Sequence, residues 1–327
     1  MSRRLRLAGN ERGFALIAVL LVLAFMAIIG AEFAYSMRLE ATAARVYKET
    51  LIATHLAEAG LEQAVRELAA EYAFVGLGDK ADKGDKKDAE ADAECPLTFY
   101  SRERLAIKRL PHRNVTLGAG QFSYCISDEQ ARLNLNTSPP DRVSRLLEAV
   151  GVERQARDAL VDGLQDWRDP NEEHRLNGAE SEDTYLKLPI PYRSKNANLD
   201  SLAELIQIKG VTTKLLEGED GRPGLAGLVT VKSPGQVNIN TAPREVLRAL
   251  NLSAAEINEI EQQRRLGPYG SNHRFSGRGL TFTSQTFRIE AQGLVDGQVR
   301  ARLTAIVQKR ADTGGEGVLV LEWSGVQ

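Results

Sequence analysis

The sequence is poor in the residues on which many enzymes and metal proteins depend. Its 327 residues include two cysteines and four histidines, with no CxxC pair and no GxSxG motif. A structural zinc site and a serine-hydrolase nucleophile elbow are therefore not expected. The formal net charge of −2 supplies no basic field that would recruit nucleic acid. We therefore expect a protein that is not an enzyme and does not bind nucleic acid.

The two cysteines, Cys95 and Cys125, leave two alternatives open. In an oxidising compartment they could form a disulfide. Otherwise they remain unpaired thiols, with Cys125 buried in a strand, because the sequence does not show whether the two lie close together.

A long apolar run lies near the amino terminus. Residues 14–31 form a stretch of 18 uncharged residues, which as a helix would span about 27 Å, close to the thickness of a hydrocarbon core. Four arginines and one glutamate precede the run, and a positive flank of this kind stays on the cytoplasmic side. The run predicts a single-pass membrane anchor. Small residues in IIGAEFAYS leave a cleaved secretory signal as the alternative.

The helical pattern continues past this run. Small or apolar residues recur at steps of three and four from Met37 to Leu68, and residues 31–72 contain no proline and one glycine, Gly60. We therefore expect one helix over residues 14–72, which begins as the anchor and continues as an amphipathic stem. A plain anchor followed by a coiled-coil stalk would show the same pattern.

A charged, low-complexity segment follows the expected stem. Residues 76–94 are dense in Asp, Lys, Glu and Ala, with no branched aliphatic residue beyond Leu77. Such a segment does not bury a core, so we expect a flexible charged loop over residues 73–96.

Strand-like sequences lie on both sides of the centre of the chain. Residues 97–136 and 284–310 are rich in aromatic and β-branched residues with polar residues interleaved. The Asp-Gly pair in LVDGQV suits a primed turn and predicts a hairpin in the second region. We expect the two regions to form one small sheet against the lower part of the stem, followed by a tail at residues 311–327.

The central region, residues 137–283, has a helical pattern and an internal repeat. LNLNTSPPDRVSRLLEAVGV at 133–152 matches VNINTAPREVLRALNLSAAE at 237–256. We expect the repeated asparagines to bond the backbone in tight turns, and Thr137 and Thr241 to be helix N-caps with proline just inside the start. The predicted fold class is α+β, with a large helical domain inserted into an antiparallel sheet.

A further helical unit contains the sequence IKGVTTKLL. It resembles a helix-hairpin-helix turn, in which backbone amides often bind nucleic-acid phosphates, but Val211 and Thr212 follow Gly210 where a second glycine is usual. The nearby basic residues are Lys209 and Lys214. We interpret the unit as a packing module of the helix-hairpin-helix or SAM-like type. A membrane-anchored, competence-type DNA-binding protein is the alternative function.

The densest acidic cluster lies at residues 160–186. Asp162, Asp166 and Asp169 recur at steps of four and three and therefore share one helix face. After Pro170 a loop adds further carboxylates, and oxygen ligands on a loop are what calcium prefers. Helix capping within a solvated loop is the alternative. Asp166 and Asp169 would also suit a general acid and base, but no apolar pocket motif surrounds them.

The amino-terminal sequence ERGFALIAVLLVLAFMAIIGAEF resembles the type III signal of type IV pilins and pseudopilins. The resemblance implies that residues 1–13 are a leader, that prepilin peptidase cleaves between Gly13 and Phe14, and that Phe14 is then N-methylated. Most members carry a glutamate at the fifth mature residue, which is Ala18 here. That glutamate would neutralise the amino terminus of a neighbouring subunit within lipid. Its absence suits a filament tip, or equally a plain anchor.

Further motifs narrow the resemblance. DWRDPNEEHRLNGAESEDTY, LNLNTSP, VNINTAP and the closing RIEAQG and RARLTAIVQ are similar to the protein K family of type II secretion systems, the large minor pseudopilins. The resemblance implies a pseudopilin fold with a long amino-terminal helix, a small antiparallel sheet and a large inserted helical domain. It also implies calcium binding, for which the expected ligands are Asp166, Asp169, Asn171, Glu180 and Asp183.

The same resemblance implies a location, partners and a role. The chain would cross the bacterial inner membrane once, with its amino terminus in the cytoplasm and its carboxyl-terminal domain in the periplasm. It would join minor pseudopilins of the I and J types at the tip of the pseudopilus, on an inner-membrane assembly platform. There it would initiate or cap pseudopilus assembly for export of folded proteins across the outer membrane.

Overall fold

The computed structural model describes residues 11–78, 95–219, 221–271, 273–312 and 315–325. It begins with one long helix, α1, from Glu11 to Ala69, which is continuous because no proline interrupts it. This confirms the expected anchor-and-stem helix, which ends three residues earlier than predicted. The chain divides into two compact units between Ile52 and Ala53.

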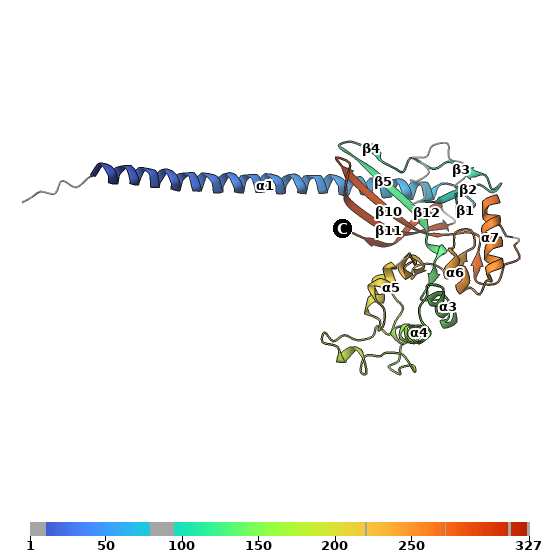
Figure 1. Ribbon diagram of the computed structural model, residues 1–327. Helices are drawn as coiled ribbons and strands as arrows, with labels where there is room; N and C mark the ends of the chain where they lie inside the picture. The colour runs from blue at the N-terminus through green and yellow to red at the C-terminus, as the bar shows by residue number, and fades with distance from the viewer. Residues whose placement is uncertain (1–10, 79–94, 220, 272, 313–314, 326–327) are drawn as a thin grey trace, which may run out of the picture. The chain divides into compact units, whose positions relative to one another are not determined.

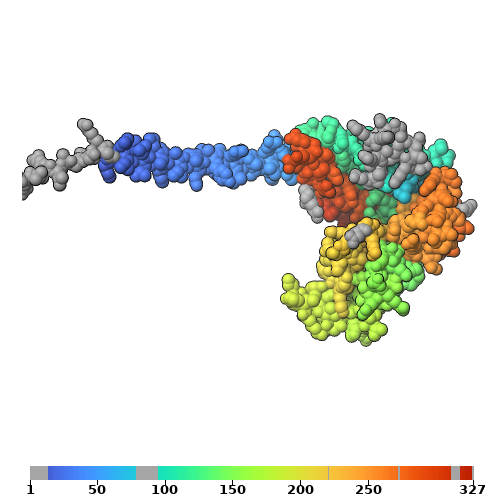
Figure 2. All heavy atoms as spheres, in the orientation of Figure 1, coloured from blue at the N-terminus to red at the C-terminus, as the bar shows by residue number. Residues whose placement is uncertain are grey.

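The first unit is the amino-terminal part of α1, and its side chains are exposed. All side chains from Phe14 to Lys48 are exposed, and Figure 2 shows one face of this segment in blue. Phe25 is 65% exposed and Met26 is 68% exposed. The helix is long and apolar enough to cross a membrane. Large apolar side chains exposed over so many turns suit lipid or partner helices rather than water.

The second unit is built on a five-stranded antiparallel sheet with the order β12-β11-β10-β5-β4 (Figure 1). Its strands are β4 (Val115–Leu117), β5 (Gly120–Asp128), β10 (Thr286–Val295), β11 (Gln298–Asp312) and β12 (Gly315–Ser324). β5 pairs with β10, so the two strand regions meet as neighbours, as predicted. Asp296 and Gly297 join β10 to β11 with positive φ angles of 51° and 73°, which confirms the predicted hairpin and its primed turn.

β12 corrects the expectation of a tail over residues 311–327. Residues 315–324 pair with β11 in a register that runs from Asp312↔Gly315 to Thr304↔Ser324. Their sequence, GEGVLVLEWS, is rich in branched aliphatic residues, which suit a strand. The sheet therefore extends one strand further than predicted.

The last third of α1 packs against this sheet. Its buried apolar side chains are Ala53, Leu56, Ala57, Leu61, Ala64 and Leu68. Glycines allow the close approach: a Cβ on Gly60 would lie 3.1 Å from the Phe122 ring, and a Cβ on Gly293 would lie 1.8 Å from the Ala53 carbonyl oxygen. This contact buries the stripe of the stem that its sequence pattern predicted.

A buried ion pair holds the carboxyl end of α1. Glu67 is 6% exposed and accepts hydrogen bonds from Arg109 Nη2, from Tyr124 Oη at 3.0 Å and from Leu110 N at 3.1 Å. Burial, followed by the charge of Glu67, raises the pKa of the Tyr124 hydroxyl. Glu67 therefore joins the stem to β5 and to the segment that precedes β4.

A second, three-stranded antiparallel sheet lies beside the end of the stem. Its strands are β1 (Phe74–Leu77), β2 (Leu97–Tyr100) and β3 (Ala106–Ile107). β1 corrects the expected loop over residues 73–96, because Val75 is fully buried and its backbone pairs with Phe99. Residues 79–94 of that expected loop lie outside the described part of the chain.

β5 and β10 are separated by a domain of short helices, as the predicted fold class requires. Its α-helices are α3 (Pro140–Ala149), α4 (Arg154–Arg168), α5 (Thr213–Glu217), α6 (Arg244–Ala249) and α7 (Ala254–Leu266). Its 3-10 helices are η1 (Glu129–Ala131), η2 (Tyr185–Lys187), η3 (Leu202–Gln207) and η4 (Leu225–Gly227). Two parallel pairs also occur, β6 (Leu133–Asn134) with β7 (Val229–Thr230) and β8 (Val237–Asn238) with β9 (Leu280–Thr281).

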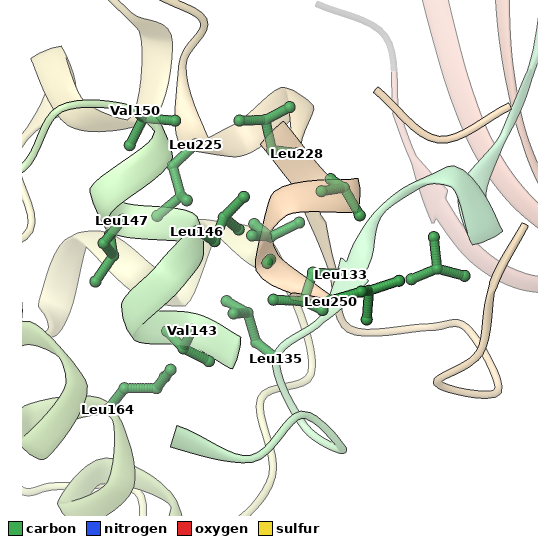
Figure 3. Packing of buried hydrophobic residues seen from close by; sticks show 14 of the residues in the cluster. Leu133, Leu135, Val143, Leu146, Leu147, Val150, Leu164, Leu225, Leu228 and Leu250 are labelled. Carbon is green, nitrogen blue, oxygen red and sulfur yellow. The ribbon is translucent and has the colours of Figure 1, made fainter. Parts of the chain in front are cut away.

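The core of this inserted domain is aliphatic. Val143, Leu146 and Leu147 project from one face of α3 into a cluster that includes Leu135 and Leu164 (Figure 3). Side chains at three- and four-residue steps on α3 thus meet residues from the other helices. Burial of this cluster explains why such short helices are stable together.

The two copies of the internal repeat have the same turn geometry. Asn134 Oδ1 accepts from Asn136 N at 2.8 Å, and Asn238 Oδ1 accepts from Asn240 N at 2.9 Å. The backbone-bonding role predicted for the asparagines is confirmed. The predicted threonine caps are wrong. Pro139 and Pro243 occupy the N-cap positions of α3 and α6, and the Thr241 hydroxyl instead donates to the carboxylate at the end of β5.

Candidate functional site

The predicted cleavage position lies in the first turn of α1. Gly13 and Phe14 belong to this turn, and Ala18 follows one turn later within the exposed segment. Phe14 is 78% exposed, and no charged residue occurs from Phe14 to Ala31. The helix therefore presents an uncharged apolar surface over these residues, with the methyl group of Ala18 on it. Cleavage and methylation stay predictions.

The acidic cluster is organised around Asp166 at the end of α4. Asp166 is fully buried, and it accepts hydrogen bonds from Arg175 Nη1 at 2.7 Å and from Ala179 N at 2.9 Å. A Cβ on Gly178 would lie 1.8 Å from Asp166 Oδ2. The loop can therefore wrap this closely around the carboxylate only because residue 178 is glycine.

Arg175 was not predicted as part of the site, although it is a cation within an acidic cluster. Its Nη1 atom also contacts Asp169 Oδ2 at 2.6 Å, so one guanidinium bridges Asp166 and Asp169. The hydrogen bond to Asp169, partly offset by burial, raises the pKa of Arg175. Asn171 Nδ2 donates to Asp169 Oδ1 at 2.8 Å, which adds a third predicted ligand to the same chain of contacts.

Glu180 and Asp183 form the other half of the cluster. Glu180 is 2% exposed, and its Oε2 accepts from Ser194 Oγ at 2.8 Å. Among the described residues its Oε1 has no hydrogen-bond partner. Burial first, and then the charges of Asp166 and other carboxylates, raise the pKa of Glu180. Asp183 Oδ1 accepts from Glu180 N at 3.0 Å.

The five predicted calcium ligands are thus neighbours, but they do not surround one point. In the described ranges no group of three or more Asp, Glu, His or Cys side chains is arranged to hold a metal. The Arg175 guanidinium lies between two of the carboxylates, where a cation would be attracted. The unpaired, buried Glu180 oxygen is the observation that fits an added cation. The ligand set stays a prediction.

The two cysteines form a disulfide, which decides between the alternatives left open by the sequence. Cys95 and Cys125 are bonded with a Cα–Cα distance of 5.5 Å. The bond joins the segment before β2 to β5, and so links the two sheets covalently. Such a bond persists in an oxidising compartment.

The IKGVTTKLL unit is a packing element. Gly210 has a φ of 88°, Thr212 Oγ1 caps the five-residue helix α5 by accepting from Leu215 N, and Ile208 is buried in the core of the inserted domain. Lys214 is paired with Glu219 at 2.6 Å. These contacts support the interpretation of the unit as a packing module.

Comparisons with known proteins agree on one family. Residues 125–218 match the family model described as "Type II secretion system (T2SS), protein K". A type II secretion system protein K of Klebsiella pneumoniae is 27% identical over 271 residues, which cover 79% of this chain and 74% of that protein. The homologue from Pectobacterium carotovorum is 28% identical over 222 residues, covering 63% of this chain and 60% of that protein.

A solved structure has the same fold. It is the crystal structure of the GspK-GspI-GspJ complex from the type 2 secretion system of enterotoxigenic Escherichia coli. The match covers 88% of this chain and 99% of the matched chain, with a TM-score of 0.56 and 16% sequence identity. The match supports the fold described above.

Proposed function

We propose, from the premise that this chain belongs to the protein K family of type II secretion systems, that it is a minor pseudopilin. It stands at the tip of a periplasmic pseudopilus, where it initiates or caps assembly for the export of folded proteins. The observation that carries this proposal is α1, a single helix whose first part is bare and apolar and whose last part is the stem of a folded domain. Its role is structural, without catalysis of its own.

The mechanism that we propose is packing. The bare segment from Phe14 to Lys48 is first a membrane anchor and then docks beside the helices of other subunits. Ala18 brings no charge into lipid, so the subunit needs no neighbour above it to supply a positive amino terminus. The bulky inserted domain would hinder addition of a further subunit. Both properties suit the first or last subunit of a filament.

The orientation that we propose follows from charge and chemistry. The arginine-rich flank, residues 1–13, stays in the cytoplasm, and α1 crosses the inner membrane once. The folded domain then lies in the periplasm, an oxidising compartment that suits the disulfide between Cys95 and Cys125.

We also propose partners. The solved structure with the same fold is a complex of GspK with GspI and GspJ. We propose that this chain assembles in the same way with minor pseudopilins of the I and J types, on an inner-membrane assembly platform, after processing by prepilin peptidase.

The first experiment is the mass of the amino-terminal peptide of the native protein, extracted from membranes of cells with and without prepilin peptidase. We expect a mature chain that begins at methylated Phe14 and depends on the peptidase. An intact Met1, or a start after residue 30, would remove the filament mechanism. Deletion of residues 14–31 should also abolish membrane retention and copurification with I- and J-type subunits, and a truncated protein that still supports secretion would contradict the proposal.

A separate proposal is that the acidic loop binds calcium. If Ca²⁺ binds only the folded protein, its addition raises the unfolding temperature and a chelator lowers it. Glu180→Gln should remove most of this shift, whereas Glu182→Gln, at the neighbouring exposed position, should retain it. An unfolding temperature that is the same with Ca²⁺ and with chelator would contradict calcium binding.

A further inference from the structure

The inserted domain is connected to the sheet by two chain crossings that lie side by side. The chain leaves the sheet at the end of β5, at Asp128, and returns at the start of β10, at Thr286. Phe287 is the sheet partner of Asp128. Two adjacent crossings form a hinge, about which a domain can swing unless side chains hold it.

Asp128 lies at this hinge and gathers donors from both sides of it. It is 4% exposed, and its Oδ2 accepts from Thr241 Oγ1 at 2.5 Å, Ser284 Oγ at 2.6 Å and Asn238 Nδ2 at 2.9 Å. Asn238 and Thr241 belong to the second repeat of the inserted domain, and Ser284 to the returning chain. A single carboxylate of the sheet thus binds both the inserted domain and the segment through which the chain returns to the sheet.

The next two residues strengthen the same joint. Gln130 Oε1 accepts from Gln285 N at 2.6 Å and from Thr286 N at 3.2 Å. Glu129 is fully buried and pairs with Arg132 and, at 3.0 Å, with Arg288 of β10. Residues 128–130, which we call the junction segment, therefore tie the outgoing chain to the returning one at three consecutive positions.

The internal repeat provides a comparison within the molecule. Asn134 and Asn238 are equivalent, and each accepts the backbone N–H two residues later through Oδ1. Their Nδ2 atoms differ: that of Asn134 donates to the Ser233 carbonyl oxygen at 2.5 Å, and that of Asn238 donates to Asp128. The same turn residue therefore binds within the inserted domain in the first copy, whereas in the second copy it binds the sheet.

We propose that Asp128 is the positioning residue that fixes the inserted helical domain on the pseudopilin sheet. A buried carboxylate with this many donors is costly to disturb, because removing it leaves each donor without a partner. As a consequence, the inserted domain is held in one orientation relative to the sheet. This matters for the proposed function, on which it rests, because a subunit at a filament tip needs a fixed domain.

The test measures the distance between the two parts in the full-length protein in detergent. Spin labels are attached at Arg154→Cys in the inserted domain and Val299→Cys in the sheet, where the native side chains are 87% and 39% exposed. The native cysteines are joined to each other and do not react. Asp128→Ala should broaden the distance distribution by about twofold or more relative to wild type. An unchanged narrow distribution in a folded Asp128→Ala protein would overturn the proposal.

Matched variants separate positioning from general destabilisation. Asn238→Ala should broaden the distribution, whereas Asn134→Ala, which loses the same turn bond, should not. Equal effects of the two would overturn the proposal. If Asp128→Ala does not fold, the Thr241→Val/Ser284→Ala double variant removes two of the donors, and an unchanged distribution there would be equally decisive.

A secretion assay on the same variants keeps the two proposals distinct. Broadened distances with lost secretion support both. Broadened distances with normal secretion support the role of Asp128 and contradict the requirement for a fixed domain at the tip.

Discussion

The two ends of α1 belong to one continuous helix but have opposite surroundings. From Phe14 to Lys48 every side chain is exposed, including phenylalanines, leucines and methionines. From Ala53 to Leu68 the apolar side chains at three- and four-residue steps are buried by the protein's own sheet. Helix formation is therefore the same in both parts, whereas the partner of the apolar face differs.

This difference separates two tasks within one element. The carboxyl-terminal part contributes to the stability of the folded domain, because its side chains lose contact with water there. From Phe14 to Lys48 no side chain is buried, so this part does not stabilise the folded domain through burial. Its apolar residues remain available to contact lipid or other chains. Substitutions in the two parts should accordingly affect different measurements.

The largest effect is expected at Gly60, where the helix touches the sheet. Gly60→Leu should lower the free energy of unfolding by more than about 4 kcal/mol, because even a Cβ at this position lies 3.1 Å from the Phe122 ring. Gly30→Leu is the matched control, since a Cβ there has nothing within 4 Å. Urea unfolding of the two variants measures the free energy of unfolding of each. Equal stability would break the comparison between the two parts of α1.

The next largest effect is expected at Glu67. Glu67→Ala should cost about 3–5 kcal/mol, because it leaves the Arg109 guanidinium buried without its carboxylate. Glu71→Ala is the control, since its pair with Arg102 is more than three-quarters exposed on both sides and should cost less than about 1 kcal/mol. Unfolding of both variants should be followed by circular dichroism. A small loss at Glu67 would show that the buried pair does not hold the stem.

A charge in the exposed amino-terminal part of α1 should weaken membrane insertion without changing the stability of the folded domain. Leu21→Lys should disfavour membrane insertion by about 2.5–3.5 kcal/mol and release protein into the soluble fraction. The unfolding of the folded domain should not change. Tyr47→Lys, at a 72% exposed position beyond the uncharged run, is the control and should stay in the membrane. Retention of the Leu21→Lys protein would contradict the anchor.

The smallest effect is expected from pH, and only in the buried part. Burial lowers the pKa of His112, which lies near the carboxyl end of the stem, from its usual value of 6.5. Because the folded state binds a proton less readily than the unfolded state, the contribution of His112 is present above pH 6.5. It is lost as the pH falls through the lowered pKa. Thermal unfolding between pH 7.5 and 5 should show this slope, and His112→Gln should flatten it.

The sequence predicted the elements that depend on local patterns. The long helix, the Asp-Gly hairpin, the asparagine turns and the inserted position of the helical domain follow from periodicity, turn chemistry and repetition. Strand β12 was missed because its short apolar stretch follows a polar segment and is recognisable only once β11 provides a partner. β1 was missed for the same reason, since it lies at the edge of a charged segment and pairs with β2 across it.

The sequence by itself determined where this chain is helical, where it carries an uncharged apolar surface and which motifs relate it to a family. These properties depend on neighbours a few residues apart. The tertiary structure alone decided the partners across long separations: Arg175 between two carboxylates, Cys95 with Cys125, and Asp128 with Asn238. Such pairs depend on how the chain folds back on itself. The pattern of residue types along the chain does not show which distant residues come close together.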